Sequence, residues 1–107
     1  MKRFLLVAFL ALFAATAAGA AAPVIYTKHA IERLEQRRIE KAWVERVLDN
    51  PDWVETDPKN EKVRRAYGRI EEARGMILRV VYTDVRRGRL IITQFFDDGA
   101  ERRARSR

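Results

Sequence analysis

The chain has 107 residues, with 22 lysines and arginines, 15 aspartates and glutamates, no cysteine and a single histidine, His29. This length allows at most one small domain. The lack of cysteine excludes disulfides, thiolate metal sites and a lipid anchor on cysteine, and one histidine alone does not form a zinc site. We therefore expect a domain that uses neither a metal nor a cofactor.

Residues 1–22 have the layout of a secretory signal peptide. A basic start precedes an apolar run over residues 4–15, and small residues follow, with Ala-Gly-Ala at 18–20 fitting the cleavage rule. We expect a leader helix that is cleaved, a periplasmic or secreted product and no membrane attachment afterwards. The alternative is an uncleaved membrane anchor, because this segment has about the 20 residues that a membrane helix needs. A true start at Val24 would leave the domain in the cytoplasm, but the ordered leader regions argue against it.

The net charge of +7 lies mostly at the two ends of the chain. The body from residue 23 to residue 100 has 16 basic and 14 acidic residues, a charge of only +2. The basic balance therefore says little about the body, and binding of RNA or another polyanion depends on where its arginines face. We expect a small α+β domain over residues 23–100 and a basic, disordered tail over residues 101–107.

Apolar spacing after Pro23 predicts two short helices, at residues 28–36 and 40–49, with Ile39 turned inward at the corner between them. Pro51 ends the second helix. The helical apolar positions are Ala30, Ile31 and Leu34 in the first helix, and Trp43, Val44, Val47 and Leu48 in the second. We expect these side chains to cover a sheet.

From residue 52 the apolar period changes to two, which predicts four strands. They lie at residues 52–56, 63–70, 76–85 and 90–97. The later connections are short and contain glycine, as antiparallel hairpins require. The expected fold is α+β, with two N-terminal helices packed on a four-stranded antiparallel sheet and the signal-peptide helix before them.

Several arginines fall on one side of the predicted strands. Arg65, Tyr67 and Arg69 alternate to one face, and Arg64, Ala66, Gly68 and Ile70 to the other. Arg79 lies between Ile77 and Val81, and Thr93 lies between Ile91 and Phe95. Burying an unpaired charge in an apolar strand is costly. Either Arg79 binds a ligand, or it snorkels or pairs with an acid such as Glu71 or Glu72 on a solvated surface.

His29, Arg33 and Arg37 stand at positions i, i+4 and i+8 and form one stripe along the first helix. Histidine titrates near neutral pH, arginine offers a planar fork to phosphate, and tyrosine or threonine positions a proton. If Arg79, Tyr67 and Thr93 of the sheet converge on this stripe, the groups for metal-free phosphate transfer are present. Alternatively, His29 bonds the helix backbone and Arg33 pairs with a glutamate.

The segments YTKHAIERLEQRRIEKAWVERVLDNP, RRAYGRI, LRVVY and IITQFFD resemble the bacterial domain of unknown function 4258 family, whose members open with Tyr-Thr-x-His-Ala-x-x-Arg-hydrophobic-x-x-Arg. The resemblance runs from Tyr26 to about Asp97. That family resembles in layout the RelE-type and barnase-like ribonuclease toxins, which work without metal from the open face of a sheet. Our chain departs from the family pattern at Arg38, where glycine is usual, at Glu40, where a capping serine is common, and in having a leader.

The resemblance implies a toxin-type ribonuclease that has RNA as its substrate. Together with the expected leader it suggests an exported ribonuclease, which would need an immunity or antitoxin protein as its partner. The residues expected to carry cleavage are His29, Arg33, Arg79, Tyr67 and Thr93, and those expected to bind phosphate are Arg37, Arg65 and Arg69. The alternative is a non-catalytic exported module that binds an anionic ligand or a protein partner. The sequence does not predict the oligomeric state.

Overall fold

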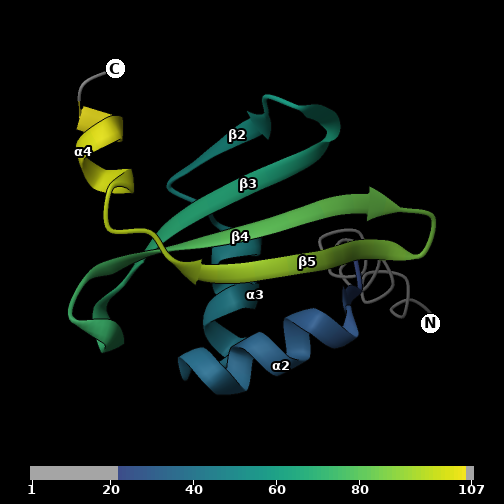
Figure 1. Ribbon diagram of the computed structural model, residues 1–107, viewed down its shortest axis with the longest axis horizontal. Helices are drawn as coiled ribbons and strands as arrows, with labels where there is room; N and C mark the ends of the chain where they lie inside the picture. The colour runs from purple at the N-terminus through teal and green to yellow at the C-terminus, as the bar shows by residue number, and fades with distance from the viewer. Residues whose placement is uncertain (1–21, 106–107) are drawn as a thin grey trace, which may run out of the picture.

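The computed structural model describes residues 22–105, so the leader expected at residues 1–22 lies almost wholly outside the described residues. The elements in chain order are β1 (Val24–Tyr26), α2 (Lys28–Arg37), α3 (Lys41–Asp49), β2 (Trp53–Asp57), β3 (Asn60–Ile70), the 3-10 helix η1 (Glu71–Ala73), β4 (Met76–Val85), β5 (Gly88–Phe96) and α4 (Ala100–Arg105) (Figure 1). In this part of the chain no helix has the length and apolar character needed to span a membrane.

Both predicted N-terminal helices are present, and their ends have clear local causes. The Thr27 side chain caps α2 by accepting a hydrogen bond from the Ala30 N–H at 3.0 Å. Arg38 ends α2 in the left-handed conformation, with φ 55°, which explains why glycine suits this position better. Glu40 makes no side-chain capping bond at the start of α3, so both departures from the family pattern fall on this corner.

The sheet is mixed and has five strands in the order β1-β5-β4-β3-β2. The α+β class and the four antiparallel strands are confirmed, but β1 adds to the edge of β5 in parallel, so the expectation of a purely antiparallel sheet of only four strands was wrong. The Arg89 N–H donates to the Pro23 carbonyl at 2.8 Å beside β1. A Cβ on Gly88 would lie 2.2 Å from that carbonyl oxygen, so only glycine permits this approach.

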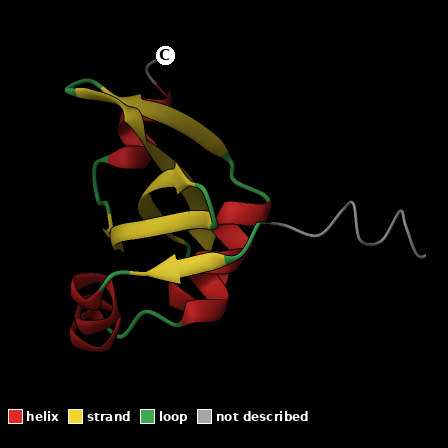
Figure 2. Ribbon diagram, turned by 90° about the vertical axis from the view of Figure 1, so that its right-hand side faces the viewer, coloured by secondary structure: helices red, strands yellow, loops and turns green. Residues whose placement is uncertain are grey.

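The core lies between the sheet and helices α2 and α3, which cover the same face (Figures 1 and 2). Val44, Val47, Leu48 and Ile39 are buried as predicted, whereas Trp43 is only partly buried. Ile31 was expected to face the sheet but is 41% exposed. Gly68 allows close packing of α3, because a Cβ there would lie 2.9 Å from Val47 Cγ2.

A β-bulge in β5 changes which side chains share a face. Val81 pairs with Thr93 but Tyr82 pairs with Ile91, so Ile92 is the extra residue. Ile91 therefore points into the core, where it is fully buried, instead of sharing a face with Thr93 as simple alternation predicted.

The basic tail, expected to be disordered from residue 101, contains α4 (Ala100–Arg105), and residues 106–107 are outside the described part. This helix lies away from α2 and α3 (Figure 2). Ala100 is fully buried and packs with Tyr67, Ile77 and Trp53 in a second cluster, separate from the main core. Helix α4 therefore covers part of the sheet face opposite to α2 and α3.

Candidate functional site

The face of the sheet turned away from α2 and α3, which we call the outer face, carries most of the predicted site residues. Strand pairing arranges its side chains in two rows that cross the sheet. The first row is Trp53, Tyr67, Arg79 and Phe95, and the second is Glu55, Arg65, Val81 and Thr93. Alternation along β3 places Arg65 and Tyr67 on one face, as predicted, and the pairing of Tyr67 with Arg79 brings Arg79 of β4 to the same face.

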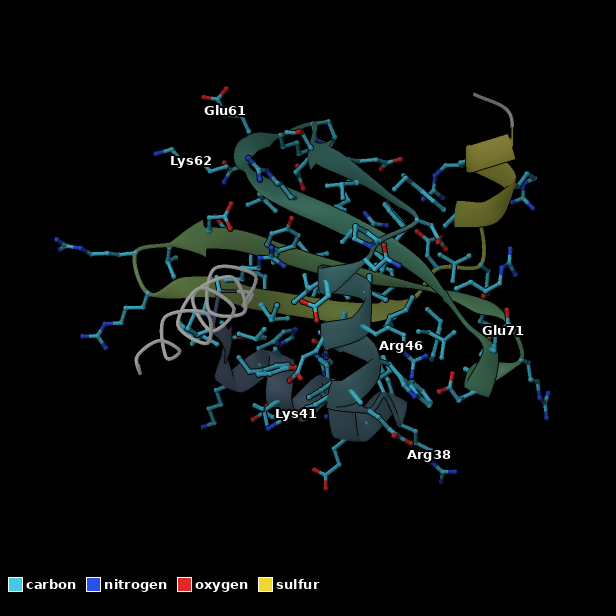
Figure 3. The ribbon with its side chains drawn as sticks, turned by 180° about the vertical axis from the view of Figure 1, so that it is seen from behind. Arg38, Lys41, Arg46, Glu61, Lys62 and Glu71 are labelled. Carbon is cyan, nitrogen blue, oxygen red and sulfur yellow. The ribbon has the colours of Figure 1, made fainter. Side chains whose placement is uncertain are left out.

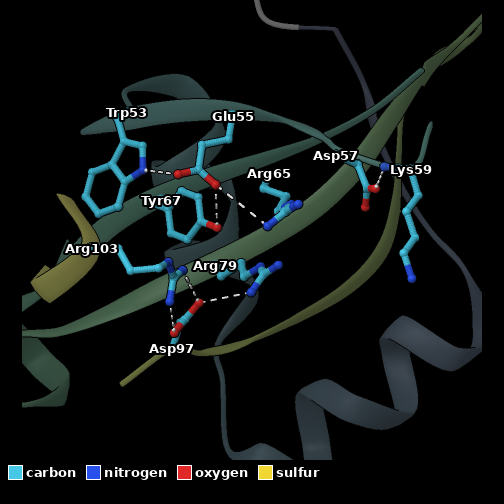
Figure 4. Close-up of polar contacts among 9 residues, drawn as sticks. All are labelled: Trp53, Glu55, Asp57, Lys59, Arg65, Tyr67, Arg79, Asp97 and Arg103. Carbon is cyan, nitrogen blue, oxygen red and sulfur yellow. Dashed lines mark hydrogen bonds and ion pairs between the residues drawn. The ribbon is translucent and has the colours of Figure 1, made fainter. Parts of the chain in front are cut away.

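Glu55 is the acceptor at one side of this face (Figure 4). It accepts hydrogen bonds from the Tyr67 hydroxyl at 3.1 Å and from Trp53 Nε1 at 3.3 Å. Arg65 Nη1 lies 3.7 Å from the same carboxylate, and each of these two side chains is 15% exposed. The Trp53 ring stacks on Tyr67 with 4.6 Å between ring centroids. Tyr67 is fully buried and its hydroxyl proton is directed to Glu55.

Arg79 lies beside this cluster and is paired with an acid. Its Nη1 donates to Asp97 Oδ2 at 3.0 Å, and Arg103 Nη2 binds the same oxygen at 2.9 Å (Figure 4). Burial raises the pKa of the Asp97 carboxyl, but bonds from Arg103, the Gly99 N–H and Arg79 outweigh it, so the pKa lies below its ordinary value. Arg79 therefore forms an ion pair, as the second interpretation expected, but its partner is Asp97 and not Glu71 or Glu72.

Arg37 connects helix α2 to the outer face. Strand β1 covers β5 only up to Ile91, and beyond it the side chain of Arg37 reaches the exposed edge of β5. Its Nη1 donates to the Gln94 carbonyl at 2.9 Å and to Thr93 Oγ1 at 3.4 Å. The guanidinium also lies 5.7 Å from the centroid of the Phe95 ring, which Arg79 approaches to 5.0 Å. The predicted residues Arg37, Thr93 and Arg79 therefore meet around Phe95.

His29 and Arg33 are on α2 but do not join this group. The His29 side chain is exposed and makes no hydrogen bond or ion pair with another described residue. It lies eight residues before Arg37, or about 12 Å along the helix axis. Arg33 is half-buried and donates to the Gln36 side chain, while its Nε is buried without a partner in the described part of the chain. The alternative role of Arg33, pairing with a glutamate, is therefore not present among the described residues.

Three other positions of the opening motif have structural roles. Tyr26 lies in β1 and its hydroxyl donates to Glu45 at 3.4 Å; burial, followed by the nearby Glu45 charge, raises its pKa. Thr27 caps α2, and the Ala30 carbonyl accepts a bond from Gln94 Nε2 at 2.9 Å. Packing therefore accounts for these three positions, whereas it gives no account of the exposed His29.

Arg69 lies away from the Phe95 group. Its Nη1 donates to the Gly75 carbonyl at 2.6 Å and its backbone N–H donates to Asp52 at 3.0 Å, at the far end of β3. Other charged side chains, such as Glu61, Lys62 and Arg38, point outward from the ends of the molecule (Figure 3). The described residues include no group of three or more His, Asp or Glu side chains that could hold a metal.

Sequence reasoning missed Glu55 and Asp97, which pair with Arg65 and Arg79, and also Arg103, which pairs with Asp97. Alternation in the strand at residues 52–56 does place Glu55 on the same side as Trp53, so this acid could have been found. Asp97 and Arg103 lie beyond the end of β5, where no strand period applies.

Comparisons with known proteins give one match. A family model described as "Domain of unknown function (DUF4258)" matches residues 26–95, from β1 to nearly the end of β5. No curated protein and no solved structure matches the chain. These comparisons do not bear on the layout shared with RelE-type or barnase-like ribonucleases, which stays a prediction.

Proposed function

The chain belongs to the family described as domain of unknown function DUF4258. We propose that this protein binds RNA where α2 crosses the edge of β5, and that it cleaves the RNA without a metal ion. The observation that carries this proposal is the meeting of Arg37 and Arg79 at Phe95, next to Thr93. Two guanidinium groups beside an aromatic ring suit an RNA backbone, because arginine binds phosphate bidentately and bases stack on aromatic rings.

In this proposal the helix stripe and the sheet hold neighbouring phosphates. Arg37 and Arg79 bind one phosphate, and Arg65 adds positive charge on the same face. His29 and Arg33 are one helical turn apart and take the scissile phosphate. As the general base, His29 removes the proton of the ribose 2′-hydroxyl, whose oxygen attacks the adjacent phosphorus. The bond to the 5′ oxygen breaks, that oxygen takes a proton from water, and His29 returns its proton to the solvent, which leaves a 2′,3′-cyclic phosphate and a 5′-hydroxyl.

The remaining predicted residues act through position. Tyr67 is a buried residue of the outer face whose hydroxyl bonds to Glu55 and positions it. Glu55 in turn pairs with Arg65 and positions its guanidinium. Thr93 accepts a bond from Arg37 and orients its guanidinium at the strand edge. Arg69 could bind a phosphate only at the far end of β3, because its guanidinium is held there by the Gly75 carbonyl.

The experiment is digestion of total RNA by the purified protein in the presence of a chelator. We expect cleavage by the wild type, a rate lower by ~10²–10⁴-fold for His29→Ala, which removes the general base, and unchanged RNA binding. Lys28→Ala, which changes the neighbouring exposed residue on α2, is the control and should cut as the wild type does. Equal cleavage by His29→Ala and the wild type would contradict the role of His29.

One observation favours a second candidate, a non-catalytic binding module for an anionic ligand. No described side chain bonds to His29 and orients it, whereas a catalytic base is usually held by a further group. RNA binding by the wild type without any cleavage would establish this module in place of the ribonuclease.

We also propose that the protein is exported, on the basis of residues 1–22. RNA is scarce outside the cytoplasm, so an exported ribonuclease would act on other cells and need an immunity protein as its partner. N-terminal sequencing of the protein recovered from the periplasm should begin at or near Ala21. Recovery of intact Met1 in the membrane fraction would indicate an anchor, and a cytoplasmic product would contradict export.

A further inference from the structure

The segment after β5 places an acid on the arginine that we assign to RNA. Asp97 directly follows the strand and lies beyond the family match, which ends at residue 95. Its carboxylate is 3.0 Å from Arg79 Nη1, and the side chains of Asp97 and Arg79 are only 10% and 20% exposed. An anion therefore already occupies this guanidinium, within the same chain.

Helix α4 holds this acid in place. The Gly99 N–H donates to Asp97 Oδ1 at 3.0 Å, and the Ala100 N–H donates to the Asp97 carbonyl at 3.1 Å, which fixes the turn between β5 and α4. Ala100 is fully buried against Tyr67, the residue paired with Arg79 across the sheet. The segment from Asp97 through α4 thus closes one end of the outer face.

Arg103 gives Asp97 a second cation. Its Nη2 and Nη1 lie 2.9 Å and 3.5 Å from the two carboxylate oxygens. If Asp97 moves away from Arg79, its charge still has a partner on α4. A buried carboxylate that lost its only cation would be costly to keep. This second pair therefore lowers the cost of releasing Arg79.

We propose that the segment from Asp97 through α4 is an internal inhibitor of the RNA site, in which the Asp97 carboxylate occupies on Arg79 the place of an RNA phosphate. Carboxylate and phosphate compete for the same guanidinium N–H groups. RNA binding transfers Arg79 from Asp97 to the phosphate, and Asp97 stays paired with Arg103. This inference rests on the proposed function, because it needs Arg79 to bind RNA.

The inference predicts opposite effects for the two partners of Asp97. Asp97→Asn removes the competing charge, so RNA should bind roughly tenfold more tightly. Arg103→Met removes the second cation, so Asp97 has only Arg79 as a charged partner. Releasing Arg79 then costs more, and RNA should bind more weakly. Each change also alters the net charge, which affects any polyanion. Asp98→Asn and Arg102→Met are the matched controls, since both residues are exposed neighbours with the same charges.

The measurement is fluorescence anisotropy of a labelled, single-stranded 2′-O-methyl RNA, which cannot be cleaved, with the full-length protein at one fixed salt concentration. The inference is supported if Asp97→Asn binds more tightly than Asp98→Asn, and Arg103→Met more weakly than Arg102→Met. It is overturned if Asp97→Asn binds no better than Asp98→Asn. If Asp97→Asn does not fold, the comparison of Arg103→Met with Arg102→Met decides, and equal RNA affinities of these two variants overturn the inference. If the wild type and every variant fail to bind RNA, the proposed function falls as well.

Discussion

The two faces of the sheet are built from alternate residues of the same strands, yet they are stabilised differently. The inner face is one continuous apolar cluster, in which Leu78 and Val80 of β4 pack under α2 and α3. The outer face carries Arg79 between them in sequence, and its Arg65 and Arg79 are paired with the acids Glu55 and Asp97. Stability is therefore shared among many contacts on the inner face and is local on the outer face.

The difference shows where function can be added to so small a domain. Apolar burial supplies most of the stability of a fold, and the inner face supplies that burial here. Charged side chains on the outer face need partners, but they do not have to fill a core. A ligand can exchange with such a partner without unfolding the chain, which an inner-face residue could not allow.

The largest expected effect is on the inner face, where Val47→Asp should unfold the domain. Val47 is 2% exposed, and burying an unpaired charge costs several kcal/mol, which is comparable to the whole stability of a small domain. Circular dichroism during thermal unfolding measures this. The control is Val54→Asp, because Val54 is 46% exposed on β2 and should tolerate the charge. A Val47→Asp variant with normal thermal stability would show that α3 is not packed on the sheet.

A smaller effect is expected where a polar side chain lies in the inner face. Gln94 is fully buried and its Nε2 bonds to the Ala30 carbonyl, which ties α2 to β5. Gln94→Leu should lower the free energy of unfolding by about 0.5–1.5 kcal/mol, the net contribution of one hydrogen bond. Urea denaturation gives this value, with the exposed Gln36→Leu as control. No change in Gln94→Leu would mean that the bond adds nothing to the packing of α2.

The smallest effect is expected for an ion pair in solvent. Arg46 and Glu72 form a bidentate pair, and both side chains are 49% exposed. The Arg46 hydrogen bond lowers the pKa of Glu72 from 4.5 to about 2. A lowered carboxyl pKa stabilises the fold above pH 4.5, and this contribution is lost as the pH falls towards 2. Since exposed pairs contribute little, Glu72→Gln should unfold at nearly the wild-type temperature at pH 7. A drop as large as that of Gln94→Leu would contradict this ranking.

Periodicity in the sequence predicted most of the inner face. Both helices and four strands were found, and β4 (Met76–Val85) has the bounds expected from its alternation. The strand β1 (Val24–Tyr26) was missed because three residues show no period and their partner strand is far along the chain. The bulge at Ile92 was missed because strict alternation cannot contain an extra residue.

The outer face was predicted only in part. Alternation assigned Arg65 and Tyr67 to one face, because a strand fixes the direction of its own side chains, and the register with β4 adds Arg79 to that face. It could not identify Asp97 as the partner of Arg79, since the path of the chain after a strand is set by tertiary packing, here that of Ala100. For the same reason, helical spacing aligned His29 with Arg37 but did not show that only the second reaches the sheet.

The central claim is that Arg37 and Arg79 bind RNA phosphate together at the outer face. Its most direct test is the affinity of Arg37→Met and Arg79→Met for the same uncleavable RNA, because methionine keeps the aliphatic stem and removes the fork. The control is Arg64→Met, which removes an exposed arginine of β3 outside the two rows. We predict that both site variants keep an intact fold, shown by cooperative unfolding, and that they bind RNA at least ~10-fold more weakly than Arg64→Met. Equal affinities for all three variants, with intact folds, would contradict the account.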